Sequence, residues 1–97
     1  MKIYKYPLEI TDRQVIPTEY LVAYPLAVAE QNGQLTLWAY MDDKIIPQLR
    51  DKNNAYELIV EIVGTGQDFE ETMRYVGTVV MSNGFVWHVF AESRVKK

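Results

Sequence analysis

The dipeptide Asn32-Gly33 lies between two runs of alternating character, and this feature constrains the fold more than any other in the chain. The run LAVAEQ precedes the dipeptide and QLTLWAY follows it. Both central residues of a type I′ turn need positive φ, which Asn and Gly tolerate best, so we expect a two-residue β-hairpin here. The turn fixes the register, which pairs Gln31 with Gln34, Glu30 with Leu35, Val28 with Leu37 and Leu26 with Ala39.

This register divides the hairpin into two faces, because successive side chains of a strand point to opposite sides of a sheet. The face that we expect to join the core carries Leu26, Val28, Leu35, Leu37 and Ala39. The other face is mixed and has an aromatic end, and it carries Ala27, Ala29, Gln31, Gln34, Thr36, Trp38 and Tyr40.

A second Asn-Gly dipeptide, Asn83-Gly84, lies between RYVGTVVM and FVWHVFAE. A two-residue turn at this position would pair Met81 with Val86, Val80 with Trp87, Val79 with His88 and Gly77 with Phe90. Both faces of this pair are largely apolar, so we expect the two strands at the centre of the sheet.

Shorter alternating segments predict further strands at residues 2–6, 14–16 and 56–63. In the last of these, one side is apolar and the other, with Glu57, Ile59, Glu61 and Val63, is expected to be wet and acidic. Gly64-Thr65-Gly66 then predicts a turn, followed by a polar loop at residues 68–73 that contains Phe69. Residues 42–54, DDKIIPQLRDKNN, predict one helical turn or an irregular excursion, because Pro47 argues against a longer helix.

Composition excludes several classes of protein. The chain has no cysteine, which excludes a disulfide scaffold, a zinc ribbon and a thiol nucleophile. A net charge of −3 disfavours nucleic acid as a partner. No apolar run approaches the length of a signal peptide or of a membrane span, which needs about 18 residues.

We therefore expect one soluble domain over residues 1–97, either all-β or a β-rich α+β fold. It would be a small antiparallel sandwich or half-barrel with two Asn-Gly hairpins and at most one short helix.

Five blocks in order, YKYPLEITD, EQNGQLTLWA, IVGTG, YVGTV and WHVF, give the chain a family resemblance. It resembles a family of short proteins encoded by tailed bacteriophages and prophages, and the match covers most of the chain. The resemblance implies no reaction, cofactor or catalytic residue. Two segments depart from the family pattern, namely residues 40–55, which are longer here, and TEYLVAYP at residues 18–25. Both are candidates for a partner-specific surface.

The candidate chemical sites have ordinary structural explanations. His88 is the only histidine and lies mid-strand among apolar neighbours, which favours a structural role. Asp42, Asp43 and Asp51 match no calcium-loop spacing, so capping and solvation explain them better than a metal. The glycine pair at 64 and 66 lacks the further glycines of a phosphate loop. The acidic residues Glu57, Glu61, Asp68, Glu70 and Glu71 are expected to form a solvated edge, since the net charge is too small for a DNA mimic.

We expect a non-catalytic, phage-encoded binding protein, with no metal and no cofactor, that antagonises a host protein of anti-phage defence. It would act in the cytoplasm of the infected bacterial host and could form a homo-oligomer, without membrane contact. The alternatives are a small virion or assembly component, and a sponge for a nucleotide immune messenger. The candidate partner-binding residues are Trp38, Tyr40, Asp42, Asp43, Ile45, Ile46 and Leu49.

Overall fold

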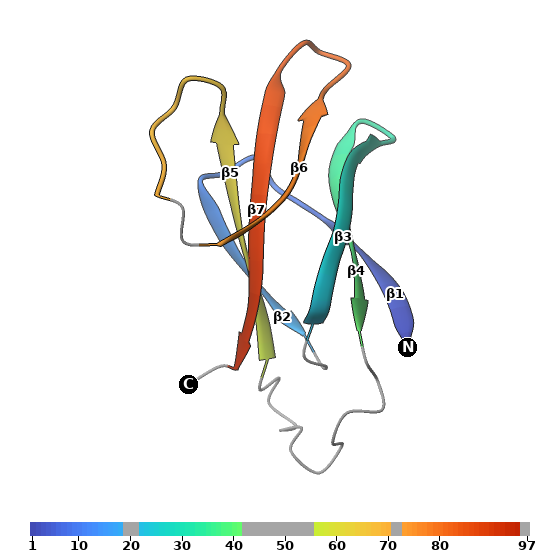
Figure 1. Ribbon diagram of the computed structural model, residues 1–97. Helices are drawn as coiled ribbons and strands as arrows, with labels where there is room; N and C mark the ends of the chain where they lie inside the picture. The colour runs from blue at the N-terminus through green and yellow to red at the C-terminus, as the bar shows by residue number, and fades with distance from the viewer. Residues whose placement is uncertain (19–21, 42–55, 71–72, 96–97) are drawn as a thin grey trace.

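The computed structural model describes residues 1–18, 22–41, 56–70 and 73–95, and these ranges form an all-β fold without a helix (Figure 1). Antiparallel pairing builds two sheets, a three-stranded sheet of order β1-β4-β3 and a four-stranded sheet of order β2-β5-β7-β6. The strands are β1 (Lys2–Pro7), β2 (Arg13–Thr18), β3 (Val22–Gln31), β4 (Gln34–Met41), β5 (Tyr56–Gly64), β6 (Arg74–Val80) and β7 (Val86–Val95). The expected antiparallel architecture is confirmed, and the predicted strands at residues 2–6, 14–16 and 56–63 are β1, β2 and β5.

The first hairpin has the predicted turn. Asn32 and Gly33 have φ of 53° and 78°, as a type I′ turn requires, and Gln31 pairs with Gln34. The predicted partners of Glu30 and Val28 are also confirmed. The prediction for Leu26 is wrong, because an irregularity between Pro25 and Ala27 pairs Pro25 with Ala39 and leaves Leu26 47% exposed. Pro25 has no N–H to donate to the ladder, and an extra residue at such a point shifts the register.

The second hairpin has a different turn from the one predicted. The N–H of Gly84 donates to the carbonyl of Met81 at 2.9 Å, and the N–H of Met81 donates to the carbonyl of Phe85 at 2.7 Å. Gly84 has φ of 95°, whereas Asn83 does not have positive φ. This is a three-residue loop, a turn followed by a glycine bulge. The predicted register is therefore wrong by one residue, and the observed pairs next to the turn are Val80 with Val86, Val79 with Trp87, Thr78 with His88 and Gly77 with Val89. An irregularity between Tyr75 and Gly77 then shifts the register once more and pairs Tyr75 with Phe90.

The corrected register decides which side chains of β6 and β7 enter the core. A slip of one residue exchanges the two faces of a strand, and here Val79, Val89 and Ala91 are buried between the sheets. Strand β7 is central, as expected, but β6 lies at the edge of its sheet. Thr78 and His88 consequently lie on the outer face of the four-stranded sheet, and the irregularity between Tyr75 and Gly77 places the pair of Tyr75 and Phe90 on the same face.

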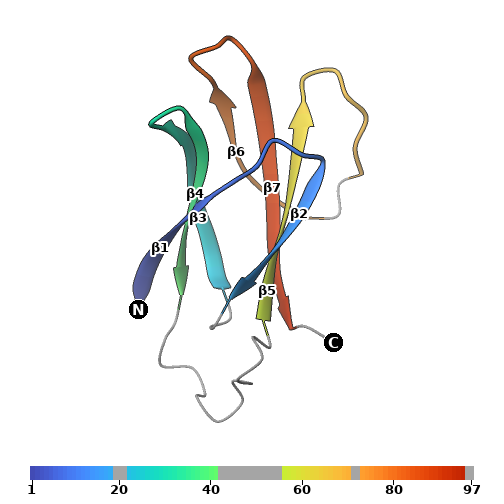
Figure 2. The same ribbon diagram turned by 180° about the vertical axis from the view of Figure 1, so that it is seen from behind.

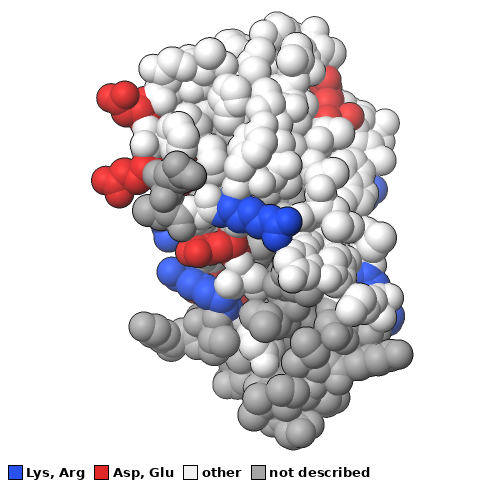
Figure 3. Space-filling model, in the orientation of Figure 1, with Lys and Arg blue, Asp and Glu red and all other residues white. Residues whose placement is uncertain are grey.

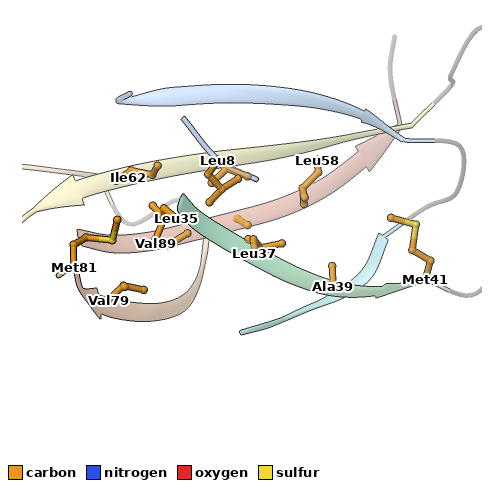
Figure 4. Packing of buried hydrophobic residues seen from close by; sticks show 12 residues of the cluster. Leu8, Leu35, Leu37, Ala39, Met41, Leu58, Ile62, Val79, Met81 and Val89 are labelled. Atoms are coloured by element: carbon orange, nitrogen blue, oxygen red, sulfur yellow. The ribbon is translucent and has the colours of Figure 1, made fainter. Parts of the chain in front are cut away.

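The core fills the space between β4 on one side and β5, β6 and β7 on the other (Figure 4). Its fully buried members include Leu8, Leu35, Leu37, Ala39, Met41, Leu58, Val60 and Val89. On the other side of β5, Ile59 and Val63 are also buried, so the expected wet face is wrong for these two residues. The glutamates beside Ile59 are ion-paired to neighbouring strands, Glu61 to Arg13 at 2.8 Å and Glu57 to Arg94 at 2.9 Å.

The two hairpins are joined to each other where β3 lies beside β6 (Figure 1). A Cβ added to Gly77 on β6 would lie 3.1 Å from Cγ2 of Val28 on β3, so the glycine permits this close approach. The carboxylate of Glu30 accepts hydrogen bonds from the N–H and the hydroxyl of Ser82, both at 2.7 Å. On the opposite side of the molecule, the connection from β1 to β2 runs from one sheet to the other (Figure 2).

Among the described strands, each of the four at a sheet edge has a feature that hinders pairing with another chain. Proline, which cannot donate to a ladder, occurs in three of them, as Pro7 in β1, Pro17 in β2 and Pro25 in β3. The fourth, β6, has no proline, but it lies against β3. A partner is therefore better recognised by side chains on the sheet faces than by addition of a strand.

Candidate binding site on the outer face of the four-stranded sheet

The connection between β5 and β6 folds back over the outer face of the four-stranded sheet. A turn starts this reversal, in which the N–H of Gln67 donates to the carbonyl of Gly64 at 3.1 Å. The side-chain oxygen of Gln67 accepts from the N–H of Gly64 at 2.8 Å, and Gly66 has φ of 86°, which glycine adopts readily. The predicted turn at Gly64-Thr65-Gly66 is confirmed, and it directs Phe69 onto β7.

Three aromatic rings form a cluster at this position, which we call the aromatic cluster (Phe69, Tyr75 and Phe90). The ring of Phe90 lies 4.9 Å from that of Phe69 and 5.5 Å from that of Tyr75, centroid to centroid. Such tilted pairs stabilise by about 0.5–1.5 kcal/mol each beyond the area that they bury. Phe90 is buried, but Phe69 is 51% and Tyr75 54% exposed, so the cluster presents aromatic surface to solvent.

A chain of hydrogen bonds runs beside the aromatic cluster and fixes the imidazole of His88. Its Nε2 lies 2.8 Å from the hydroxyl of Thr65, and its Nδ1 lies 2.9 Å from the hydroxyl of Thr78. The Thr78 hydroxyl is hydrogen-bonded in turn to the hydroxyl of Tyr75. Nε2 thus ties Thr65, at the start of the connection, to β7, and Nδ1 joins β7 to β6.

Phe69 separates two adjoining clefts. The smaller cleft, of about 220 Å³, is mainly apolar and has His88 and Thr65 at its polar end. It is lined by Val63, Gly64, Thr65, Gly66, Gln67, Phe69, Tyr75, His88 and Phe90. The larger cleft, of about 480 Å³, is acidic, since its lining includes four carboxylates and one guanidinium. It is lined by Asp12, Arg13, Glu61, Ile62, Val63, Gln67, Asp68, Phe69 and Glu70.

Charged side chains are unevenly distributed over the face that carries the clefts. Figure 3 shows this side of the molecule, where an uncharged surface extends over the upper parts of β6 and β7. Acidic side chains project at the left margin, beside the connection between β5 and β6.

The sequence-predicted partner residues lie elsewhere or outside the described ranges. Trp38 and Tyr40 are half-buried on the outer face of the three-stranded sheet, whereas the aromatic cluster lies on the four-stranded sheet. The Tyr40 ring lies 5.2 Å from that of Tyr24, over which the guanidinium of Arg74 lies at 5.1 Å. The remaining candidates, Asp42, Asp43, Ile45, Ile46 and Leu49, are outside the residues that the structure describes.

The sequence interpretation did not select the aromatic cluster. One signal for it was present, because Phe69 is an aromatic residue within a polar loop and must either be exposed or fold back onto the sheet.

Among the described residues, no group of three or more His, Asp or Glu side chains could hold a metal ion. The same ranges contain no helix that is long and apolar enough to cross a membrane.

Over residues 1–97 the chain matches the model of a protein family described as a domain of unknown function, DUF7352. No curated protein and no solved structure matches the chain. The aromatic cluster, its two clefts and their hydrogen bonds are therefore the observations from which a function has to be argued.

Proposed function

The chain belongs to the DUF7352 family, and we propose that this protein is a non-catalytic binding protein that occupies a surface of another protein. The observation that carries the proposal is the aromatic cluster. Two of its three rings are about half exposed, although they lie against a buried third ring. Exposed aromatic side chains that are held rigidly are typical anchors of protein interfaces.

The hydrogen bonds around His88 support this use of the cluster. They tie Thr65, and with it the start of the connection, to β6 and β7 through a chain of hydroxyls and an imidazole. Tyr75 is itself a member of this chain through its hydroxyl, and the ring of Phe69 packs on that of Phe90, so contacts with the sheet hold both rings. A preorganised surface loses less conformational entropy on binding, and this favours affinity.

The charge of the two clefts favours a protein partner over a nucleotide messenger. Sites for small molecules usually enclose about 300–1,000 Å³. The smaller cleft, of about 220 Å³, is below this range, and the larger one, of about 480 Å³, is lined by carboxylates, which repel phosphates. A nucleotide also needs cationic or N–H donors for its phosphates. Among the described residues that line the two clefts, the one arginine is ion-paired with Glu61.

The setting that we propose for this binding is infection by a tailed bacteriophage. The resemblance of five sequence blocks to phage and prophage proteins supports a phage origin. In this proposal the protein acts in the cytoplasm of the infected bacterium, where its target is a host protein of anti-phage defence. A virion component would instead be recovered from purified phage particles.

Affinity capture from infected host cells tests the proposal. The bait is the full chain, compared with Phe69→Ala and with Phe85→Ala as the matched control. Phe85 is also an exposed phenylalanine, 60% against 51%, and it also stacks on an aromatic ring, that of Trp87 at 5.7 Å. We expect one host protein to be retained by the wild type and by Phe85→Ala and lost with Phe69→Ala. Recovery of no host protein by the wild type would refute the proposal.

A further inference from the structure

We infer that the two clefts beside Phe69 recognise a short segment of the partner in which an aromatic side chain lies next to a lysine or arginine. This inference rests on the proposed function and names the chemistry of its partner. The smaller cleft would take the aromatic ring, and the larger cleft would take the cation.

The smaller cleft suits one aromatic side chain. Its walls are aromatic, from Phe69, Tyr75 and Phe90, and its volume of about 220 Å³ is too small for a whole ligand of ordinary size. Aromatic rings prefer tilted or offset neighbours with centroids about 4.5–7 Å apart, and the rings of the cluster already have such spacings, 4.9 and 5.5 Å. A further ring would extend this arrangement.

The polar end of the smaller cleft adds a preference among aromatic side chains. The hydroxyl of Thr65, which is bonded to His88, lies in the lining and has a second lone pair available to a donor. Tyrosine and tryptophan each have an apolar ring with one donor, so both match an apolar cleft with a polar end.

The larger cleft supplies the charge complementarity. Its lining has the carboxylates of Asp12, Asp68 and Glu70, all exposed, besides Glu61, which is ion-paired with Arg13. A cation of the partner would therefore lower the repulsion among these groups. Exposed charges of this kind contribute chiefly to association rate and specificity, and salt screens them.

The two clefts adjoin each other, so the two side chains that fill them must be close in the partner. Both clefts are lined by Val63, Gln67 and Phe69. Proline or a neighbouring strand hinders pairing at the edges of the described sheets, and this favours recognition through side chains on the face.

Selection of peptides from a random displayed library on the full chain tests the inference. We expect the enriched peptides to contain an aromatic residue with Lys or Arg beside it. Synthetic fluorescein-labelled copies are then compared by fluorescence polarisation. Replacing the aromatic residue with Ala should weaken binding by about tenfold or more. Replacing the basic residue with Glu should also weaken binding. This loss should be larger at about 0.01 M salt than at about 1 M salt, because salt screens exposed charges.

Protein variants localise the bound peptide. Phe69→Ala and Tyr75→Ala should each weaken peptide binding by about tenfold, whereas Phe85→Ala and Trp38→Ala should leave it unchanged. Circular dichroism and denaturation show whether each variant is folded, and the use of two cluster variants keeps the test decisive if one of them unfolds. The inference would be overturned if the selected peptides lacked aromatic residues or lacked basic residues. It would also be overturned if Trp38→Ala weakened their binding.

The inference and the proposed function can fail separately. If a host protein is captured through Phe69 while the selected peptides lack a basic residue, the inference fails and the proposed function stands. If peptides with the expected pattern bind through Phe69 while no host protein is captured, the proposed function fails and the binding preference remains.

Discussion

The link between the two hairpins can be tested by replacing Glu30 with alanine. The Glu30 carboxylate accepts two hydrogen bonds from Ser82, each of 2.7 Å, and these join the end of β3 to the loop between β6 and β7. Hydrogen bonds to charged groups contribute about 1.5–3 kcal/mol each, and neutral ones about 0.5–1.5 kcal/mol. Glu30 is half-buried and Ser82 is exposed. Hydrogen bonds to water therefore compensate in part for the two that are lost. We expect Glu30→Ala to lower the free energy of unfolding by about 2 kcal/mol in total.

Urea denaturation followed by tryptophan fluorescence measures this change. Ser82→Ala removes only the hydroxyl and should cost about 1 kcal/mol, and the double variant should cost no more than Glu30→Ala alone. The control is Glu9→Ala, which removes an exposed carboxylate and should change stability by less than about 0.5 kcal/mol. The reasoning is refuted if Glu30→Ala behaves like the control, or if the effects of Glu30→Ala and Ser82→Ala add within about 0.3–0.5 kcal/mol.

Three further changes test the core, the first turn and one partly buried hydroxyl. Leu37→Ala should cost about 2.7–5 kcal/mol by urea denaturation, because Leu37 is fully buried; a loss below about 1 kcal/mol would contradict the core assignment. Gly33→Ala should cost about 1–2 kcal/mol, because φ is 78° and an added Cβ would contact nothing within 4 Å; Gly33→Asn should cost less. Burial, and then the neighbouring Tyr4, raise the pKa of Tyr6 above 10.0 in the folded state. The stability that this shift contributes is present below the unfolded pKa and is lost as pH rises through the folded pKa. Tyr6→Phe should therefore lose less stability between about pH 9 and pH 11 than the wild type does, and an equal loss would contradict the assignment.

The two Asn-Gly hairpins show how far local sequence determines a turn. At Asn32-Gly33 both residues adopt positive φ, and the register close to the turn follows from that alone. The same dipeptide at Asn83-Gly84 forms a three-residue loop, since only the glycine adopts positive φ. Local preferences allow either turn. In the observed register Val79 is buried against the other sheet, so this turn goes together with tertiary packing of β6.

The candidate site was less predictable than the fold, because it depends on contacts between distant residues. His88 meets Thr65 and Thr78, which lie 23 and 10 residues away along the chain. Phe69 reaches Phe90 only because the turn after β5 reverses the connection over the sheet. The alternation in β4 did place Trp38 and Tyr40 on an outer face, and their role in partner binding stays a prediction.

Binding of a partner protein at the aromatic cluster can be observed directly through the imidazole of His88, which is hydrogen-bonded beside the cluster. His88 is the only histidine in the chain, so its ring signals can be followed by NMR in a protein purified without a histidine tag. Addition of the captured host protein should shift or broaden the signals of His88 in the wild type and in Phe85→Ala, but not in Phe69→Ala. Unchanged His88 signals in a wild-type sample that demonstrably binds its partner would contradict the account.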